Sequence, residues 1–254
     1  MKDVIKYIFL FVLVLFSFYY TDKISMILID NSSLMKKIKE EKDKFEVSSI
    51  DAIIDAEFIV PGKNGLKVNL LESYHQMKKD NRFDKDKLVF DEVIPKQSIN
   101  YNKDMIINKG RYDKKGISLV FKDNQNIIKY LNNNNIKMTR LVNKETFKSD
   151  AQYEQIAIDK DVDSLLNKYK LNKMICFDNY IDREECYKDS KYLSTYTYYI
   201  ENVLSIDNKL ISGNILYLDD YLNEQDFKLI LNKIYHSGLS LYYLSEIISE
   251  KASY

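Results

Sequence analysis

The sequence predicts an α/β fold with a parallel sheet or barrel in the C-terminal part of the chain, and three observations support this prediction. From about Lys114 onward, apolar segments of strand length alternate with segments of helix length. GISLVF at 116–121 is apolar and β-branched enough for a parallel strand that is buried on both faces. The segment 223–238 carries the apolar stripe of a helix and has Gly238 as its stop. Such alternation is typical of parallel sheets with right-handed crossovers.

The elements of this region are expected in a simple order. After the strand at 116–121, Asn124 is a candidate N-cap for a helix of about three turns. The later elements are a strand at 136–143, a helix at 161–169, strands at 173–177, 192–200 and 212–220, the helix at 223–238, a strand at 239–244 and a terminal turn at 245–250. Apolar spacing and flanking turn residues define each of them.

The N-terminus predicts a membrane anchor over residues 1–29. YIFLFVLVLFSFYY at 7–20 contains no charge, and ISMILI at 24–29 continues the apolar pattern past Asp22 and Lys23. Lys2 and Lys6 precede the run, so the positive-inside rule places the N-terminus in the cytoplasm and the rest of the chain outside. A cleaved signal peptide and a buried core helix are the alternatives. The absence of a small-x-small site after Tyr20 favours an uncleaved, single-pass anchor in the cell membrane.

Two segments separate this anchor from the α/β region. Residues 30–50 mix charges of both signs at helical spacing, which predicts a solvated helical stalk, with a dimerising coiled coil as the alternative. Residues 51–113 predict a small α+β segment. Its turn dipeptides, Pro61-Gly62 and Asn64-Gly65, indicate a strand–turn–strand unit, followed by a helix at 73–83 and strands at 87–95 and 104–110.

Composition excludes some partners and leaves the cysteines undecided. The 38 Lys and Arg residues balance the 38 Asp and Glu residues, so no sustained charge points to a nucleic-acid partner. Cys176 and Cys186 lie ten residues apart and could form a disulfide outside the membrane. Two buried thiols are the alternative.

Three pieces of the α/β region resemble one family. ISLVFKDN at 117–124 resembles the first-strand motif of the polysaccharide deacetylases (carbohydrate esterase family 4, the nodulation-protein-B homology domain), in which a strand ends in Thr-Phe-Asp-Asp-Gly. NIIKYLNNNNIKMTRLVN is similar to the helix and strand that follow. SGNILYLDD and the segment 227–249 resemble the closing unit. The resemblance implies a shortened, distorted (β/α) barrel over 114–254 and metal-dependent removal of acetyl groups from cell-wall or related polysaccharides.

The same resemblance assigns roles to positions in this chain. In the family, one aspartate is the general base, the next binds a divalent metal that is usually zinc, two histidines of a His-x-x-x-His motif complete the ligands, and a late histidine is the acid. Here the base position holds Lys122 and the metal position holds Asp123. The late acid position holds Asp219, followed by Asp220. The chain has no histidine between His75 and His236, so the histidine ligands are missing.

We therefore expect a degraded catalytic site without a bound cofactor. One carboxylate does not hold catalytic zinc, and a site made of Asp123, Asp219 and Asp220 would suit magnesium or calcium better. Lys122 and Asp123 are interpreted as a solvated turn at a strand end. The leading hypothesis is an anchored deacetylase-like protein without deacetylase activity that binds cell-wall polysaccharide or an envelope protein through its tyrosine-rich strands. An active carbohydrate deacetylase with unusual ligands and a structural envelope subunit are the alternatives.

Overall fold

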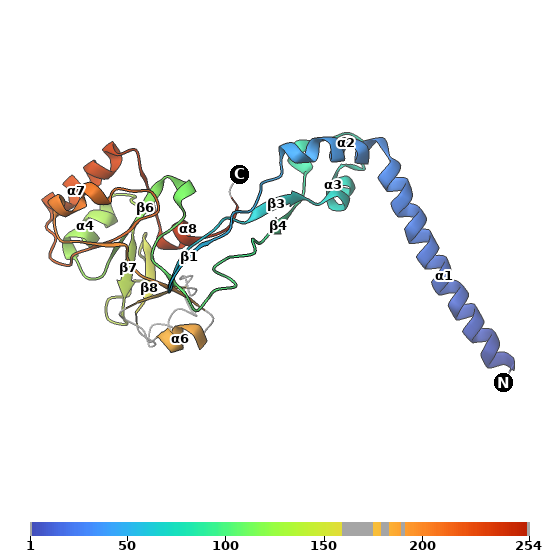
Figure 1. Cartoon of the computed structure of the whole chain (residues 1–254), viewed down its shortest axis with the longest axis horizontal. Coiled ribbons are helices and arrows are strands. Elements are labelled where there is room, and N and C mark those ends of the chain that lie inside the picture. Colours follow the sequence, from blue (N-terminus) through green and yellow to red (C-terminus); the bar gives the residue numbers. More distant parts are fainter. Residues whose placement is uncertain (1, 159–174, 179–182, 189–190, 253–254) are drawn as a thin grey trace. The chain divides into compact units, whose positions relative to one another are not determined.

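The computed structural model describes residues 2–158, 175–178, 183–188 and 191–252 (Figure 1). The chain divides into two compact units. The first combines Met1–Ser48 with Gly65–Val93, and the second combines Ser49–Asn64 with Ile94–Tyr254. Both units therefore draw on the segment between residues 51 and 113.

The first unit consists of helices packed on a two-stranded sheet. Helix α1 (Lys2–Asn31) leads into α2 (Ser33–Glu41) and the 3₁₀ turn η1 (Lys42–Lys44), and β3 (Gly65–Val68) pairs antiparallel with β4 (Phe90–Val93). Helix α3 (Leu70–Met77) and the 3₁₀ turn η2 (Lys85–Lys87) connect these strands. Leu34, Met35 and Ile38 of α2 are buried against Val68, Tyr74 and Met77. The expectation of a solvated stalk is wrong for these α2 residues, because their helical spacing forms an apolar face that the unit covers.

The first hairpin of the second unit turns at a residue that the sequence did not indicate. β1 (Ile53–Asp55) pairs antiparallel with β2 (Phe58–Val60), and the turn uses Ala56, whose φ is 52°. The predicted turns at Pro61-Gly62 and Asn64-Gly65 are therefore wrong as hairpin turns. Gly62 serves a close approach instead, since a Cβ at this position would lie 2.2 Å from the carbonyl oxygen of Ile50.

The parallel sheet predicted for the C-terminal region is confirmed. The strand β6 (Gly116–Phe121) has β12 (Ile215–Leu218) on one side. On its other side, β13 (Ser240–Tyr242) pairs with its beginning and β7 (Thr139–Val142) with its end. β11 (Tyr198–Ile200) and β8 (Glu154–Ala157) extend this sheet, and every pairing in it is parallel.

A second sheet makes the barrel a distorted one. Its order is β1, β2, β5 (Ile106–Ile107), β10 (Tyr192–Ser194) and β9 (Ile175–Phe177). Among the described residues, the hydrogen-bonded strands thus form separate sheets. The single strand predicted over 192–200 is wrong because the chain changes sheets there. The N–H of Thr195 donates to Ile107 of β5, whereas the N–H of Thr197 donates to Ile215 of β12.

Helices cover the sheet that contains β6. Helices α4 (Gln125–Asn133) and α7 (Glu224–His236) lie on one side of this sheet (Figure 1). Ile117, Leu119 and Phe121 of β6 pack with these helices and with the 3₁₀ helix η4 (Val203–Lys209), whereas Val120 belongs to the core on the opposite face. The core on that opposite face includes α8 (Leu244–Ile248), so the predicted terminal turn is a short helix. The 3₁₀ turn η3 (Tyr112–Lys114) precedes β6. The predicted helix at 161–169 lies outside the described residues.

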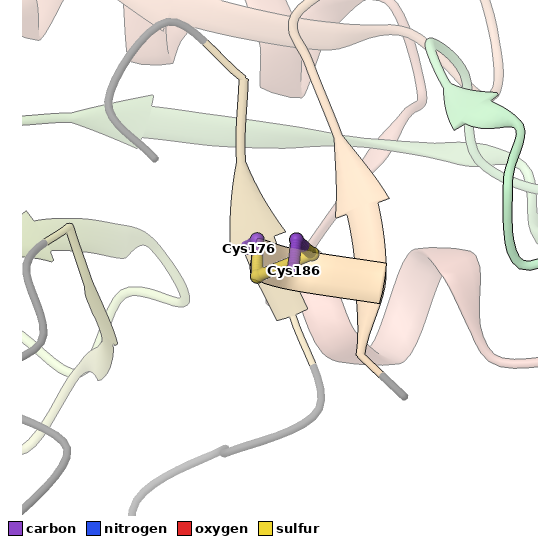
Figure 2. Close-up of a disulfide and its surroundings, with 2 residues drawn as sticks. All are labelled: Cys176 and Cys186. Carbon is purple, nitrogen blue, oxygen red and sulfur yellow. A yellow bond between two sulfur atoms is a disulfide. The ribbon is translucent and has the colours of Figure 1, made fainter. Parts of the chain in front are cut away.

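A disulfide joins the two cysteines in the second unit. Cys176 lies on β9 and Cys186 on α6 (Arg183–Lys188), with Cα atoms 6.1 Å apart (Figure 2). Both side chains are buried and pack with Ile106 and Leu193. Of the two alternatives left open by the sequence, the structure contains the disulfide.

Candidate functional site

The candidate site lies where β6 and β12 end. These strands are parallel neighbours, with Tyr217 paired to Val120, so the residues that follow them meet at one edge of the sheet. The backbone N–H of Asp123 donates to Asp220 Oδ1 at 3.0 Å. Asn124 is buried, and its Nδ2 donates to the carbonyl oxygens of Leu222 at 2.8 Å and Asp219 at 3.3 Å. The structure therefore brings the three predicted aspartates to the same edge.

Asn124 has a second role at this edge. Its Oδ1 accepts from the N–H of Ile127 at 3.0 Å, which confirms the predicted N-cap of α4. One buried side chain thus starts the helix with its oxygen and holds the loop after β12 with its nitrogen. This double use keeps the loops after β6 and β12 together.

A buried arginine underlies the edge. The side chain of Arg140 on β7 is only 2 % exposed, and its Nε and Nη1 donate to the carbonyl oxygens of Lys122 and Thr146, each at 3.1 Å. Its Nη2 lies 3.7 Å from Asp123 Oδ1. The carboxylate of Asp123 is 51 % exposed and also accepts from Gln125 Nε2 at 2.9 Å. Asp123, the residue that the family resemblance assigns to the metal position, therefore faces a fixed guanidinium, while Lys122 is half-buried beside it.

Sequence reasoning missed Arg140, although a signal was present. The predicted strand IKMTRLVN contains this arginine in the stretch Thr139–Val142, all four residues of which are buried in the structure. A charged side chain in a fully buried strand needs hydrogen-bonding partners close by. That requirement could have identified Arg140 as a residue of the site.

Asp219 is held by a tyrosine from the neighbouring strand. The hydroxyl of Tyr199 on β11 donates to Asp219 Oδ2, and the N–H of Tyr221 donates to Oδ1 at 2.6 Å. Burial raises the pKa of the Tyr199 phenol, and the hydrogen bond to Asp219 and the nearby carboxylates raise it further. Tyr199 therefore stays protonated and remains a donor at neutral pH.

Tyr199 belongs to an aromatic group that we call the tyrosine cluster, made of Tyr196, Tyr199 and Tyr217. The rings of Tyr199 and Tyr217 are stacked, with centroids 5.6 Å apart and planes at 14°. Tyr196 contacts both rings, at 6.2 and 5.6 Å. Tyr217 is buried, whereas Tyr199 is 38 % exposed. The cluster thus has a buried base and a partly exposed ring beside Asp219.

The described residues do not fit a zinc site. Among them, no group of three or more His, Cys, Asp and Glu side chains is placed to hold a metal ion. His75 belongs to α3 of the first unit, and His236 is exposed on α7, where its Nδ1 lies 2.7 Å from the carbonyl oxygen of Asn232. The carboxylates of Asp123, Asp219 and Asp220 already accept protein hydrogen bonds. A catalytic zinc needs about three protein ligands and prefers imidazoles among them.

Comparison with known sequences gives a short match. No family model matches the chain. An uncharacterized protein of Bacillus subtilis (strain 168), YlxY, is 34 % identical over 82 residues, which are 32 % of this chain and 26 % of that protein.

Two solved structures match most of the chain. The crystal structure of wild-type BA3943, a CE4 family pseudoenzyme from Bacillus anthracis, has a TM-score of 0.55 at 18 % identity and covers 86 % of this chain and 96 % of that one. A BA3943 mutant with restored enzymatic activity has a TM-score of 0.55 at 17 % identity, covering 86 % and 99 %. This chain thus has a divergent form of the fold of the family 4 carbohydrate esterases, the polysaccharide deacetylases.

Proposed function

We propose that this chain is a membrane-anchored, extracytoplasmic protein of the polysaccharide deacetylase fold that binds an envelope glycan and does not deacetylate it. The observation that carries the proposal is the buried guanidinium of Arg140, 3.7 Å from the carboxylate in the metal position. Similarity in fold to a protein described as a CE4 family pseudoenzyme supports it.

The loss of hydrolysis follows from the charges at the site. Deacetylation by this family needs a metal-activated water and a carboxylate that accepts its proton. Lys122 occupies the base position, and a lysine ammonium has three donors and no acceptor. The fixed positive charge of Arg140 also opposes a second cation at Asp123. These residues neither hold the metal nor take up the proton.

The tyrosine cluster supports retained glycan binding. Sugar rings present apolar C–H faces that pack on aromatic rings, and their hydroxyl groups donate to carboxylates. Tyr199 offers a partly exposed ring that is held in place by Tyr217 and Asp219. Tyr221, which is 94 % exposed, follows Asp219 and Asp220 on the same loop. Aromatic rings next to carboxylates therefore provide both kinds of contact.

Two features support the extracytoplasmic location. Helix α1 is long and apolar enough to cross a membrane over Tyr7–Asn31. The disulfide between Cys176 and Cys186 is of a kind that persists in oxidising compartments. Together with Lys2 and Lys6 before the apolar run, they favour an anchor whose N-terminus is cytoplasmic.

Retention of the full chain on purified peptidoglycan, with the protein in detergent micelles, tests the proposal. We expect the wild type to be retained and Tyr199→Ala to bind about ten-fold more weakly, which corresponds to ~1.4 kcal/mol. Tyr235→Ala, which removes an exposed tyrosine from α7, is the matched control and should bind like the wild type. Equal retention of all three proteins would contradict the assigned surface. Acetate release above that of Asp123→Ala would show that hydrolysis persists.

A further inference from the structure

The first unit contains a pocket that the proposed glycan site does not use. It has a volume of about 490 Å³ and lies at the junction of α1, α2 and α3. Its apolar lining consists of Met26, Ile27, Ile29, Met35, Leu70 and Leu71. Lys23, Asp30 and Asn31 of α1 complete it. Most of its walls are thus apolar, with polar groups supplied by the end of the predicted membrane span.

The end of α1 is fixed to the body of this unit. Ile29 packs against the core that contains Met35, and Asp30 forms an ion pair with Lys39 of α2. The hydroxyl of Ser32 donates to the carbonyl oxygen of Ile29 at 2.7 Å and accepts from the N–H of Met35 at 3.2 Å. These contacts join the end of α1 to α2. The position of α1 along the membrane normal therefore sets the level at which the pocket lies relative to the bilayer.

Helix geometry places the pocket at the lipid headgroups. The span Tyr7–Asn31 has 25 residues and measures about 37 Å as a helix, which is longer than the ~30 Å of a hydrocarbon core. The headgroup layer beyond it is about 5–8 Å thick, which corresponds to roughly the next four or five helical residues. A core that begins at Tyr7 therefore ends near Met26 and Ile27, at the boundary between acyl chains and headgroups, and Lys23, one turn deeper, extends its ammonium toward the headgroups.

The side chains at this level are unusually apolar for a water-facing surface. Met26 and Ile27 are 59 % and 53 % exposed, and Leu71 on α3 is 37 % exposed. Apolar surface left in water is unfavourable in proportion to its area. An acyl chain would cover this surface, and the ammonium of Lys23 would meet the phosphate of the same lipid.

We propose that this pocket binds a phospholipid of the outer leaflet, with the upper part of one acyl chain against Met26, Ile27 and Leu71 and the phosphate at Lys23. The lipid holds the first unit against the membrane surface. This inference rests on the proposed membrane anchor but not on glycan binding, because the pocket belongs to the first unit and the candidate site to the second.

The absence of tryptophan in the chain permits a direct test. The full chain is placed in phosphatidylcholine vesicles whose acyl chains carry bromine near the glycerol, and single tryptophans report contact with the lipid. Leu71→Trp probes the pocket, and Gln76→Trp is the matched control on the same helix, exposed and outside the lining. Leu13→Trp probes the span itself. Leu229→Trp on α7 reports the second unit.

We expect bromolipid to remove about half of the emission of Trp at position 71 and to shift its maximum to the blue, while the emission at positions 76 and 229 is retained. Adding Lys23→Gln to Leu71→Trp should reduce the quenching. Equal quenching at positions 71 and 76, or none at 71 while position 13 is quenched, would overturn the lipid pocket and leave the anchor intact. No quenching at position 13 would overturn the anchor and the pocket with it.

Discussion

Replacing Arg140 with methionine should lower the free energy of unfolding of the second unit by about 2–4 kcal/mol. The substitution keeps most of the buried methylene volume and removes the guanidinium that donates to Lys122 and Thr146. Each carbonyl oxygen left without its partner in a partly buried place costs about 1–2 kcal/mol. The ion pair with Asp123 adds little, because that carboxylate is 51 % exposed and therefore screened by water.

A comparison with Asp123→Asn separates these contributions. This second variant removes the charge of the partner but keeps Arg140 and its carbonyl contacts, and it should cost less than about 1 kcal/mol. Urea unfolding of a chain that begins at Ser32, followed by circular dichroism, measures both variants against the wild type. If Asp123→Asn lowers the free energy of unfolding as much as Arg140→Met does, Arg140 stabilises the fold through its ion pair rather than through its hydrogen bonds to the carbonyl oxygens. That result would refute the prediction.

Four further outcomes follow from the structure. Adding zinc or magnesium should leave the midpoint of thermal unfolding unchanged, because the site does not bind these ions. An ion that did bind, at about a hundred times its Kd, would raise the free energy of unfolding by ~2.7 kcal/mol and shift the midpoint measurably. Cys186→Ser should lower the free energy of unfolding in urea by about 3 kcal/mol, because the disulfide closes a loop with a sequence separation of 10. Reductant should destabilise the wild type by the same amount. If the variant and the reduced protein are as stable as the untreated wild type, the disulfide does not form. Tyr199→Phe should remove one late-titrating phenol from the tyrosinate absorbance curve. Because the pKa of Tyr199 is raised in the folded state, this group contributes stability below pH ~10 that is lost at higher pH. The free energies of unfolding of Tyr199→Phe and the wild type should therefore differ least at alkaline pH. Burial raises the pKa of the Glu250 carboxyl, so the stability that this group contributes to the folded state is present below pH ~4.5 and is lost as pH rises. Glu250→Gln should therefore flatten the dependence of the free energy of unfolding on pH between pH 4 and 8. Parallel curves for this variant and the wild type would refute the assignment.

The elements that local patterns describe were predicted well. The strand GISLVF is β6, and the apolar stripe at 223–238 is α7, which ends at His236 two residues before Gly238. Asn124 caps α4 as predicted. These features depend on side-chain periodicity and on hydrogen bonds over three or four residues, which a sequence displays directly.

The failures concern contacts between distant segments. The hairpin turn at Ala56 has a positive φ, but it contains no glycine or asparagine from which that conformation could be predicted. The strand expected over 192–200 divides because Thr195 and Thr197 bond to different sheets. Each outcome depends on where a partner strand lies, and a single sequence does not record that position.

By itself, the sequence determined the α/β class, the N-terminal apolar run, and the lack of any histidine between His75 and His236, because composition and residue spacing are properties of the chain alone. Only the tertiary structure decided that Arg140 points its guanidinium to Asp123, that Tyr199 holds Asp219, and that residues of α1, α2 and α3 line an apolar pocket. Those arrangements join residues from different elements, and their geometry is set by parallel strand register and core packing rather than by any local pattern.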